Sequence, residues 1–355
     1  MAHKYWEAPY CSQHSCSLRS MASTILIVGA TGYAGGDFLA HLVTTHPELE
    51  IRVFVRDEAK AEQVFKISRR ICCILGFGSP DWLHVLETET AGADIVVQIA
   101  NTDDEELSFA LLDGVAKNKN KNGVYIHISG AGNLMDVSAP LGVMQPKVYG
   151  DKSDKEEILA LPIDRPHAAI EQGLIQRAAL TNTRIAIVSF PMLYGKGRGT
   201  VASHAGHFRT YVQGVLSHGK PFVVERGENC ISSSHVSDAS SALAFLIAEV
   251  LKGEKGRIRW GREGYYMVES SELAFKDIAE EVARVLHGKG LIQSNEIDRL
   301  DAEAVSKIWS PGPLIWGGNA RARAERLREL GWIPSGPSRS EAMEDEIDSV
   351  LLSIN

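Results

Sequence analysis

The sequence predicts an α/β protein with a doubly wound parallel sheet and a smaller C-terminal lobe. Apolar runs rich in β-branched residues, such as Thr24–Gly29, alternate with helix-like segments through the first half of the chain. A glycine-rich turn, Gly29–Gly35, directly follows the first apolar run. Strands that alternate with helices are joined by right-handed crossovers, which produce a parallel sheet with helices on both faces.

Length and composition agree with a globular protein. The chain has 355 residues, a formal net charge of −8, 44% hydrophobic residues and 23% charged residues, so one large or two ordinary domains are expected. The acidic balance argues against a nucleic-acid partner, and no apolar run approaches the ~18 residues of a membrane span. The five cysteines form no C-x-x-C pair, so we expect no disulfide framework, no metal site and a cytoplasmic location.

Residues 1–22 differ from the rest of the chain. They contain no apolar segment of the ~7–15 residues that a signal peptide needs. Lys4 and Arg19 are the firm cations of this segment, too few for a mitochondrial presequence. We therefore predict a disordered extension over residues 1–22 and a domain that starts near Ser23.

The expected elements then follow in order. In the first half we expect strands at 24–29, 51–55, 71–75, 94–100, 124–129 and 184–190, with helices at 35–45, 57–66, 103–117 and 166–180. The pattern loosens after Pro191, where we expect helices at 207–217, 237–251, 272–286 and 321–330, a short strand at 264–268 and a final acidic helix after 335–340. We assign 23–194 to a nucleotide-binding domain to which 231–261 contribute, and 195–230 and 262–355 to a substrate-binding lobe.

The glycine-rich turn has the spacing G-x-x-G-x-x-G between a buried strand and a helix. Glycine lets the backbone turn tightly and approach a pyrophosphate, which the amide groups of the helix N-terminus then bind. A plain strand–helix turn is the alternative, but the agreement of strand, glycines and helix favours dinucleotide binding. The predicted cofactor contacts in this turn are Gly29, Thr31, Gly32, Tyr33 and Gly35.

The end of the second expected strand bears on the choice of cofactor. An Arg at this position accommodates the 2′-phosphate of NADP, whereas an acid binds the ribose hydroxyls of NAD. Arg56 favours NADP, and Asp57 keeps NAD open as the alternative. We also assign Phe77 and Ala100, near the ends of two further expected strands, to the cofactor site.

Further motifs resemble those of extended short-chain dehydrogenases and nucleotide-sugar epimerases. Pro191–Gly195 is similar to the P-x-x-Y-G turn of that family, Ser234–Asp238 contains H-V-x-D, and Asn319–Pro334 resembles its closing helix with Gly-Trp-x-Pro. Lys147–His167 looks most like a fungal branch of atypical members. The resemblance covers about Ser23 to Pro334. It implies a Rossmann-type domain, Pro191 and Leu193 beside the nicotinamide, and a monomer or a homodimer through helices 103–117 and 166–180.

The sequence departs from this family at the catalytic residues. Members that transfer hydride usually carry Y-x-x-x-K, but His167 takes the Tyr position here and Glu171 the Lys position. Spaced i, i+4, they would share one helix face, where Glu171 would orient His167 as the acid/base group. The alternative is that His167 only caps the helix and Glu171 is a solvated charge. The usual Ser/Thr falls near Ala131, with Ser129 two residues earlier.

Other polar residues near the expected cleft are weaker candidates. Tyr194 of the P-x-x-Y-G turn, or Tyr149 in a loop, could donate a proton. Lys196 and Arg198, in G-K-G-R-G, could bind an anionic substrate or the pyrophosphate, or form a solvated connection.

Three functions are compatible with these observations. The first is an NADP(H)-dependent oxidoreductase acting on a small or medium carbonyl, imine or alkene metabolite. The second is a catalytically silent NAD(P)-binding sensor or regulator, suggested by the missing Tyr, Lys and Ser/Thr. The third is a non-redox isomerase or cyclase with the same fold.

Overall fold

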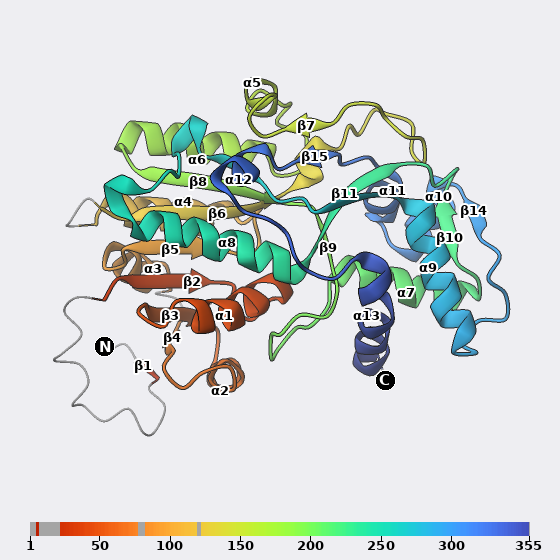
Figure 1. The fold of residues 1–355 in the computed structure, drawn as a ribbon, viewed down its shortest axis with the longest axis horizontal. Coiled ribbons are helices and arrows are strands. Elements are labelled where there is room, and N and C mark those ends of the chain that lie inside the picture. The colour runs from red at the N-terminus through yellow and green to blue at the C-terminus, as the bar shows by residue number, and fades with distance from the viewer. Residues whose placement is uncertain (1–4, 7–21, 77–81, 119–121, 355) are drawn as a thin grey trace.

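The computed structural model of the protein describes residues 5–6, 22–76, 82–118 and 122–354. Its large sheet has eight strands in the order β1-β4-β3-β2-β5-β6-β8-β12, and every neighbouring pair except β1–β4 is parallel. The strands are β1 Tyr5–Trp6, β2 Thr24–Val28, β3 Glu50–Val55, β4 Cys72–Leu75, β5 Ile95–Gln98, β6 Val124–Gly130, β8 Arg184–Phe190 and β12 Tyr265–Met267. The predicted fold class is therefore confirmed (Figure 1).

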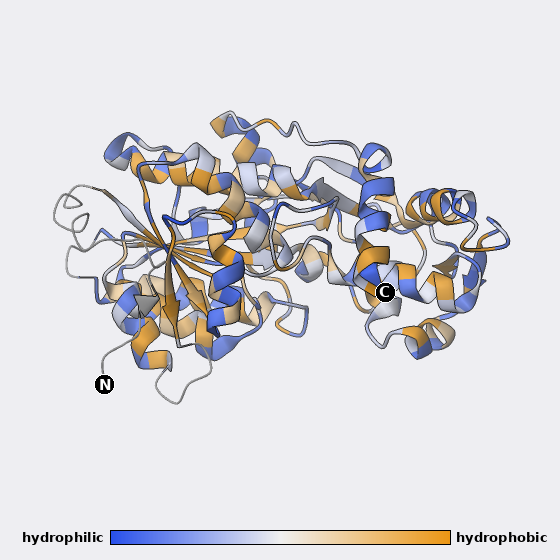
Figure 2. Ribbon diagram, turned by 90° about the horizontal axis from the view of Figure 1, so that it is seen from below, coloured by the Kyte–Doolittle hydropathy of each residue, from blue (hydrophilic) through white to orange (hydrophobic). Residues whose placement is uncertain are grey.

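Helices cover both faces of this sheet. One core contains Ile25 and Ile27 of β2, and the other contains Leu26 and Val28, so alternate side chains of a wholly apolar strand pack on opposite helix layers. The first layer has α1 Tyr33–Thr45, α2 Glu58–Phe65, α8 Val236–Leu251 and α12 Glu325–Leu330. The second has α3 Trp82–Ala91, α4 Glu105–Ala116 and α6 Ala168–Thr181. Figure 2 shows hydrophobic residues concentrated along the strands between these layers.

The C-terminal lobe has its own core. Tyr211, Phe222, Phe275 and Trp316 pack with their rings tilted or edge-on at 5.2–5.7 Å. The helices of the lobe are α7 Gly206–His218, α9 Phe275–Gly288, α10 Ala302–Ile308, α11 Gly312–Gly317 and α13 Arg339–Ile354. They surround the parallel pair β10 Phe222–Val224 and β14 Asp298–Leu300.

Smaller elements connect the lobe to the large sheet. A three-stranded sheet contains β9 Met192–Tyr194, β11 Cys230–His235 and β13 Ser271–Ala274. The pair β7 Tyr149–Gly150 and β15 Ala322–Arg323 lies near the short helix α5 Lys155–Ile158. The short 3₁₀ turns in the described part of the chain are η2 Ala131–Leu134, η3 Gly253–Lys255 and η4 Gly261–Glu263.

The structure corrects several predicted boundaries. Tyr5–Trp6 pair with β4 as an antiparallel edge strand, so this part of residues 1–22 is not a disordered extension. Residues 265–267, expected in the lobe, form β12 and extend the large sheet beyond β8. The expected helices 272–286 and 321–330 begin later, at Phe275 and Glu325, because short strands precede them. Such strands of two to four residues are decided by their pairing partners, not by local periodicity.

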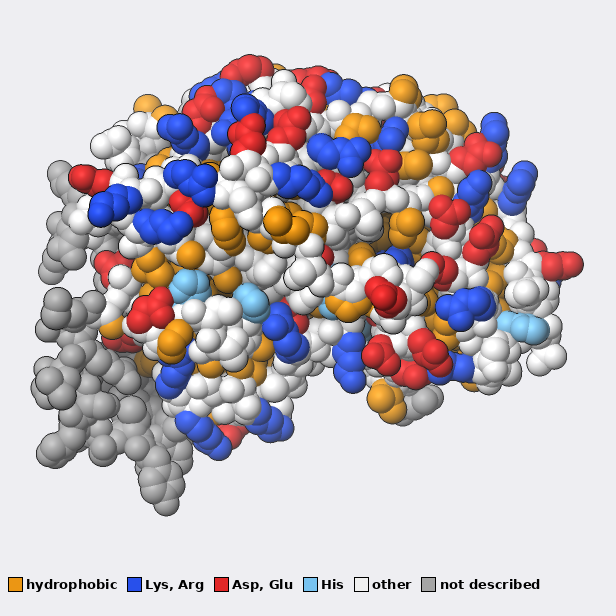
Figure 3. Space-filling view, in the orientation of Figure 1, with side chains coloured by type: hydrophobic (Ala, Val, Ile, Leu, Met, Phe, Trp, Pro, Cys, Tyr) orange, Lys and Arg blue, Asp and Glu red, His pale blue; other side chains and the backbone are white. Residues whose placement is uncertain are grey.

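The surface carries charges of both signs. On the face in Figure 3, Lys and Arg side chains are intermingled with Asp and Glu. In the part of the chain that the structure describes, no helix has both the length and the apolar character needed to cross a membrane. Within the same ranges, no three potential metal-ligating side chains of His, Cys, Asp or Glu come together.

Candidate functional site

The glycine-rich turn joins β2 to α1 and lies against the end of β5. Gly29 has φ +104°, and a Cβ there would lie 2.4 Å from the Ala100 nitrogen. A Cβ on Gly35 would lie 2.2 Å from the Gly29 oxygen. Any side chain at either position would clash with the backbone, so glycine is required by this close approach. No side chain caps α1 at Gly32, which suits a helix N-terminus that receives an anion.

A cavity of about 380 Å³ opens at the carboxyl ends of β2, β3 and β5. This cofactor cleft is lined by Val28, Gly29, Thr31, Gly32, Phe54, Val55, Arg56, Lys60, Ile99, Ala100, Asn101 and Val201. The structure thus brings the predicted Gly29, Thr31, Gly32, Arg56 and Ala100 together at the edge where such sheets bind dinucleotides. The expected Phe77 lies outside the described residues.

The walls of the cofactor cleft include residues that sequence reasoning missed. Lys60 lies in the first turn of α2, just after Arg56 in the sequence, and this nearness to the strand end could have indicated it. Val201 arrives from a distant loop, and no local signal indicated it. Asp57, the alternative ribose ligand, caps α2 by accepting a hydrogen bond from the Lys60 nitrogen at 2.8 Å.

Tyr33 connects the glycine-rich turn to the P-x-x-Y-G turn. Its hydroxyl donates to the Gly195 oxygen at 2.6 Å. Pro191 and Leu193 are buried beside this contact, in the segment that leads from β8 into β9. The Tyr194 hydroxyl donates to the Pro337 oxygen at 2.9 Å, and burial raises the pKa of Tyr194. Tyr194 is thus a packed, protonated residue at the base of the lobe and not a member of the cofactor cleft.

His167 stands at the carboxyl end of β6. It is the residue before α6 and has φ +68°, a left-handed conformation that non-glycine residues rarely adopt. Its Nδ1 lies 2.7 Å from Asp103 Oδ1, in the loop after β5. Its Nε2 lies 3.1 Å from where a Cβ of Gly130 or of Gly132 would be. The His167 ring therefore fills the space that side chains at positions 130 and 132 would otherwise occupy.

Glu171 does not orient His167, contrary to the prediction. Its side chain is buried and accepts hydrogen bonds from Ser129 Oγ at 2.5 Å and Asn133 Nδ2 at 2.8 Å. The Tyr265 hydroxyl donates to it at 3.2 Å, and burial raises the pKa of Glu171 to about 7. The i, i+4 argument failed because His167 lies outside the helix, where its left-handed backbone directs the side chain to Asp103.

A buried histidine supports the loop that holds Asp103. His127 Nε2 lies 3.1 Å from Thr102 Oγ1, and its Nδ1 lies 3.1 Å from the Tyr125 hydroxyl. Burial lowers the pKa of His127 to about 3, so this ring is neutral at physiological pH. The network fixes Thr102, the neighbour of Asp103, to β6.

The loop after β9 contains Lys196 and Arg198, and its Arg198 side chain does not point to a free anion site as predicted. Arg198 is bound by two hydrogen bonds of its guanidinium to Asp37 on α1, at 2.6 and 2.9 Å. Lys196 is exposed at the surface. Arg198 therefore holds the loop in place and does not await an anion.

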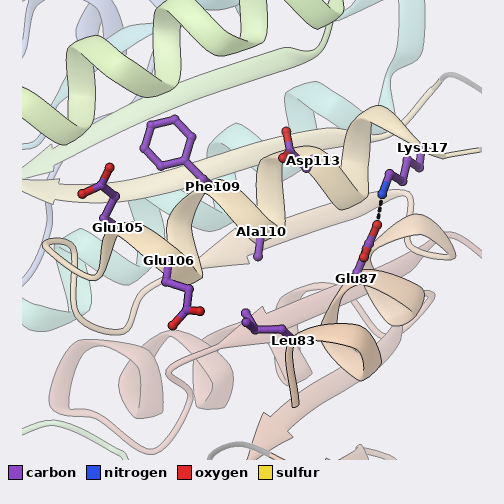
Figure 4. A pocket seen from close by; sticks show the side chains of 8 residues that line it. All are labelled: Leu83, Glu87, Glu105, Glu106, Phe109, Ala110, Asp113 and Lys117. Atoms are coloured by element: carbon purple, nitrogen blue, oxygen red, sulfur yellow. Dashed lines mark hydrogen bonds and ion pairs between the residues drawn. The ribbon is translucent and has the colours of Figure 1, made fainter. Parts of the chain in front are cut away.

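A second cavity, of about 680 Å³, lies between α3 and α4 on the outside of the sheet. Figure 4 shows its lining, in which Glu105 and Glu106 lie at the start of α4 and Asp113 lies farther along the helix, toward the Glu87–Lys117 ion pair at its other end. No part of the glycine-rich turn reaches it. Its acidic lining is unsuited to a dinucleotide phosphate.

A smaller cavity of about 230 Å³ lies on the lobe side of η2. It is lined by Leu134, Asp136, Ala139, Pro140, Gln145, Pro146, Lys147, Tyr149, Gly318, Asn319 and Arg321. Leu134 follows Asn133, which contacts Glu171. This cavity therefore begins next to the residues at the end of β6.

Comparisons with known proteins agree with this geometry. No family model matches the chain. The chain is 30% identical over 338 residues to the oxidase ucsJ of Acremonium sp., which covers 91% of this chain and 96% of that protein. Among solved structures, dTDP-glucose 4,6-dehydratase of Bacillus anthracis in complex with NAD matches with a TM-score of 0.65 and 13% identity, over 93% of this chain and 97% of that one.

A second solved structure has the same architecture. UDP-glucose 4-epimerase of Thermotoga maritima with UDP-glucose matches with a TM-score of 0.62 and 13% identity, over 94% of this chain and 100% of that one. At such identities the solved structures establish the fold. The chain belongs to the family of the Acremonium oxidase ucsJ and has the fold of the extended short-chain dehydrogenases of the epimerase/dehydratase type.

Proposed function

We propose that this protein is an NADP(H)-dependent oxidoreductase that acts on a small or medium carbonyl, imine or alkene metabolite. The observation that carries the proposal is the His167–Asp103 pair, which lies at the end of β6 and joins the residue that precedes α6 to the loop after β5. The likeness to proteins solved with NAD and to a relative named an oxidase supports an oxidoreductase of this fold.

The residues present fit a dinucleotide. The glycines of the first turn leave room for a pyrophosphate beside an uncapped helix N-terminus. Arg56 and Lys60 line the adenosine end of the cofactor cleft, while the Asp57 carboxylate is engaged as a helix cap. Among the described residues that line the cofactor cleft there are two cations and no Asp or Glu, which favours a ribose that carries a 2′-phosphate.

Arg56→Ala and Lys60→Ala are each expected to weaken NADPH binding about tenfold, since a hydrogen bond to a charged group contributes roughly 1.5–3 kcal/mol. NADH lacks the 2′-phosphate, so its affinity should change little. Fluorescence titration of both cofactors measures the difference. Lys66→Ala is the matched control, because Lys66 is an exposed cation at the end of the same helix. Equal losses for NADPH and NADH would contradict the assignment of these residues to the 2′-phosphate.

His167 is the group that moves the proton. With Nδ1–H donated to Asp103, Nε2 keeps its lone pair and can accept a proton from a substrate hydroxyl. NADP bound in this cleft would supply hydride transfer. When the substrate is reduced instead, protonated His167 returns the proton to the oxygen.

The size of the substrate is supported by the cavity beside η2. A volume of about 230 Å³ admits only a compact molecule, because it is below the roughly 300–1,000 Å³ of ordinary ligand sites. Leu134, Ala139 and Pro140 offer apolar contacts, and Gln145 and Asn319 offer amide groups.

Glu171 favours a second candidate function, a cofactor-binding protein without hydride transfer. A buried carboxylate in the Lys position supplies no cation to the nicotinamide side. The test is to mix purified protein with NADPH or NADP⁺ and a panel of carbonyls, alcohols and imines. Consumption of cofactor with a substrate supports the oxidoreductase, whereas binding without consumption supports the sensor. Conversion of a substrate without net loss of NADPH supports the isomerase or cyclase.

A further inference from the structure

The segment of residues 195–203, which follows β9, crosses back over the nucleotide-binding domain before α7 begins. In Figure 1 the green chain descends from β9 beside α1 and then turns into α7. Val201 of this segment lines the cofactor cleft together with Gly29 and Arg56. A part of the chain assigned to the lobe by sequence thus forms one wall of the cofactor cleft.

We propose that residues 195–203 form a strap that holds the bound dinucleotide, with Val201 in contact with it and the Arg198–Asp37 pair as the positioning clasp. This inference rests on the proposed binding of NADP(H). It assigns cofactor retention to residues far from the glycine-rich turn in sequence.

The clasp is an ion pair between a buried carboxylate and a half-exposed guanidinium. Asp37 is 1% exposed. It accepts hydrogen bonds from the Arg198 backbone nitrogen at 2.9 Å, from the Arg198 guanidinium at 2.6 and 2.9 Å, and from Ser240 Oγ at 2.6 Å. Burial works to raise the Asp37 pKa, but the hydrogen bonds of Arg198 and Ser240 hold it below its ordinary value. The carboxylate is therefore charged and ties the strap to α1 and α8 at once.

Further contacts attach the strap along its length. Thr200 Oγ1 donates to the Gln63 oxygen of α2 at 2.7 Å. A Cβ on Gly36 would lie 2.9 Å from the Gly199 Cα, so α1 and the strap touch backbone to backbone. The Gly197 nitrogen donates to the Ser203 oxygen at 2.8 Å, which closes the loop on itself. The strap is thus held by α1 and α2, the helices that follow the two strands flanking the cofactor cleft.

This placement also explains the sequence G-K-G-R-G. Gly195 has φ +89°, and a Cβ there would lie 2.2 Å from the His235 ring. Gly199 packs against Gly36, where a side chain would force the two backbones apart. The glycines let the strap lie close to α1, and the Arg between them supplies the clasp.

The strap makes cofactor release depend on breaking the clasp. A dinucleotide in the cofactor cleft would lie between Gly29 and Gly32 on one side and Val201 on another. Movements of such loops often set release rates. The Asp37 carboxylate accepts the hydrogen bonds that join Arg198 of the strap to α1 and α8. A neutral amide at position 37 removes the charge of this pair and one acceptor oxygen, so the strap should open more often in that variant.

The test measures the NADPH dissociation rate by stopped-flow displacement. Asp37→Asn is expected to raise this rate about tenfold, and Val201→Gly should raise it without touching the clasp. Asp113→Asn is the matched control, because Asp113 forms a similar two-bond pair with Arg177 between α4 and α6, away from the cofactor cleft. Circular dichroism of each variant separates local opening from unfolding, and Val201→Gly keeps the test decisive if Asp37→Asn does not fold.

A second readout is limited trypsin digestion followed by mass spectrometry. Lys196 and Arg198 are the trypsin sites of the strap, so NADPH should slow cleavage there in the wild-type protein and protect less in Asp37→Asn. Faster release in both variants, with protection in the wild type, supports the strap. If the wild type and both variants bind NADPH and release it at the same rate, the strap proposal is wrong, and the proposed function is unaffected. A wild type that does not bind NADPH would contradict both.

Discussion

His167→Ala is expected to lower turnover about 10²-fold or more, which is the usual loss when a general acid or base is removed. The reason is the geometry of the pair: Asp103 holds Nδ1 at 2.7 Å, so Nε2 is the atom left to exchange the proton. Affinity for NADPH should stay within about twofold, because His167 does not line the cofactor cleft. Steady-state kinetics with the first substrate found in the panel measures the effect.

Two further variants make this result specific. His167→Asn removes the imidazole but suits the left-handed backbone at this position, so a loss in both variants cannot come from strain. Asp103→Asn should also lower turnover, because an amide no longer favours the Nδ1–H form of the ring. His218→Ala is the matched control, since His218 pairs with Asp298 at 3.0 Å in the lobe. Unchanged turnover in His167→Ala would remove this residue from the mechanism.

Glu171→Gln is expected to change how stability depends on pH. The pKa of Glu171 is raised from 4.5 to about 7 in the folded protein by burial. A raised pKa means that the folded state holds the proton more tightly than the unfolded state. The stability from this proton is therefore fully present below about pH 4.5 and is lost as pH rises through about 7. At about 1.4 kcal/mol per pKa unit, the loss is about 3 kcal/mol.

Urea unfolding at several pH values between about 4.5 and 8 measures this linkage. Relative to Glu171→Gln, the wild-type protein should lose unfolding free energy across that range. The difference between the two curves isolates Glu171, because the other titrating groups, such as Asp151 with its raised pKa and His127 with its lowered pKa, are the same in both proteins. Glu58→Gln, an exposed substitution at the start of α2, should follow the wild type. Identical slopes for wild type and Glu171→Gln would show that folding does not shift the pKa of this carboxyl, which contradicts the prediction.

The core of the fold could be predicted because its signals are local. Thr24–Val28 is apolar at every position and leads into a glycine-rich turn, so strand, turn and helix agree with one another. The same agreement places β8 at Arg184–Phe190, as predicted. The short strands β13 and β15 lack such a signal, since each exists only through its pairing with a distant strand. The strand at 264–268 was predicted, but its place in the large sheet follows only from its pairing with β8. Helix α3 was not predicted, and its apolar positions give no strong helical period.

The candidate site likewise has features that local sequence predicts and features that it does not. The sequence by itself determined the glycine-rich turn after the first strand and the position of Arg56 at a strand end, and it predicted that His167 and Glu171 take the places of the Tyr/Lys pair. Only the tertiary structure decided the partners of these residues: Asp103 for His167, the Ser129–Asn133–Tyr265 group for Glu171, and Asp37 for Arg198. The physical reason is that a motif within one turn is set by neighbouring backbone angles. The direction of a side chain and its bonding partner depend instead on loops that meet across the sheet edge, and in His167 on a single left-handed residue.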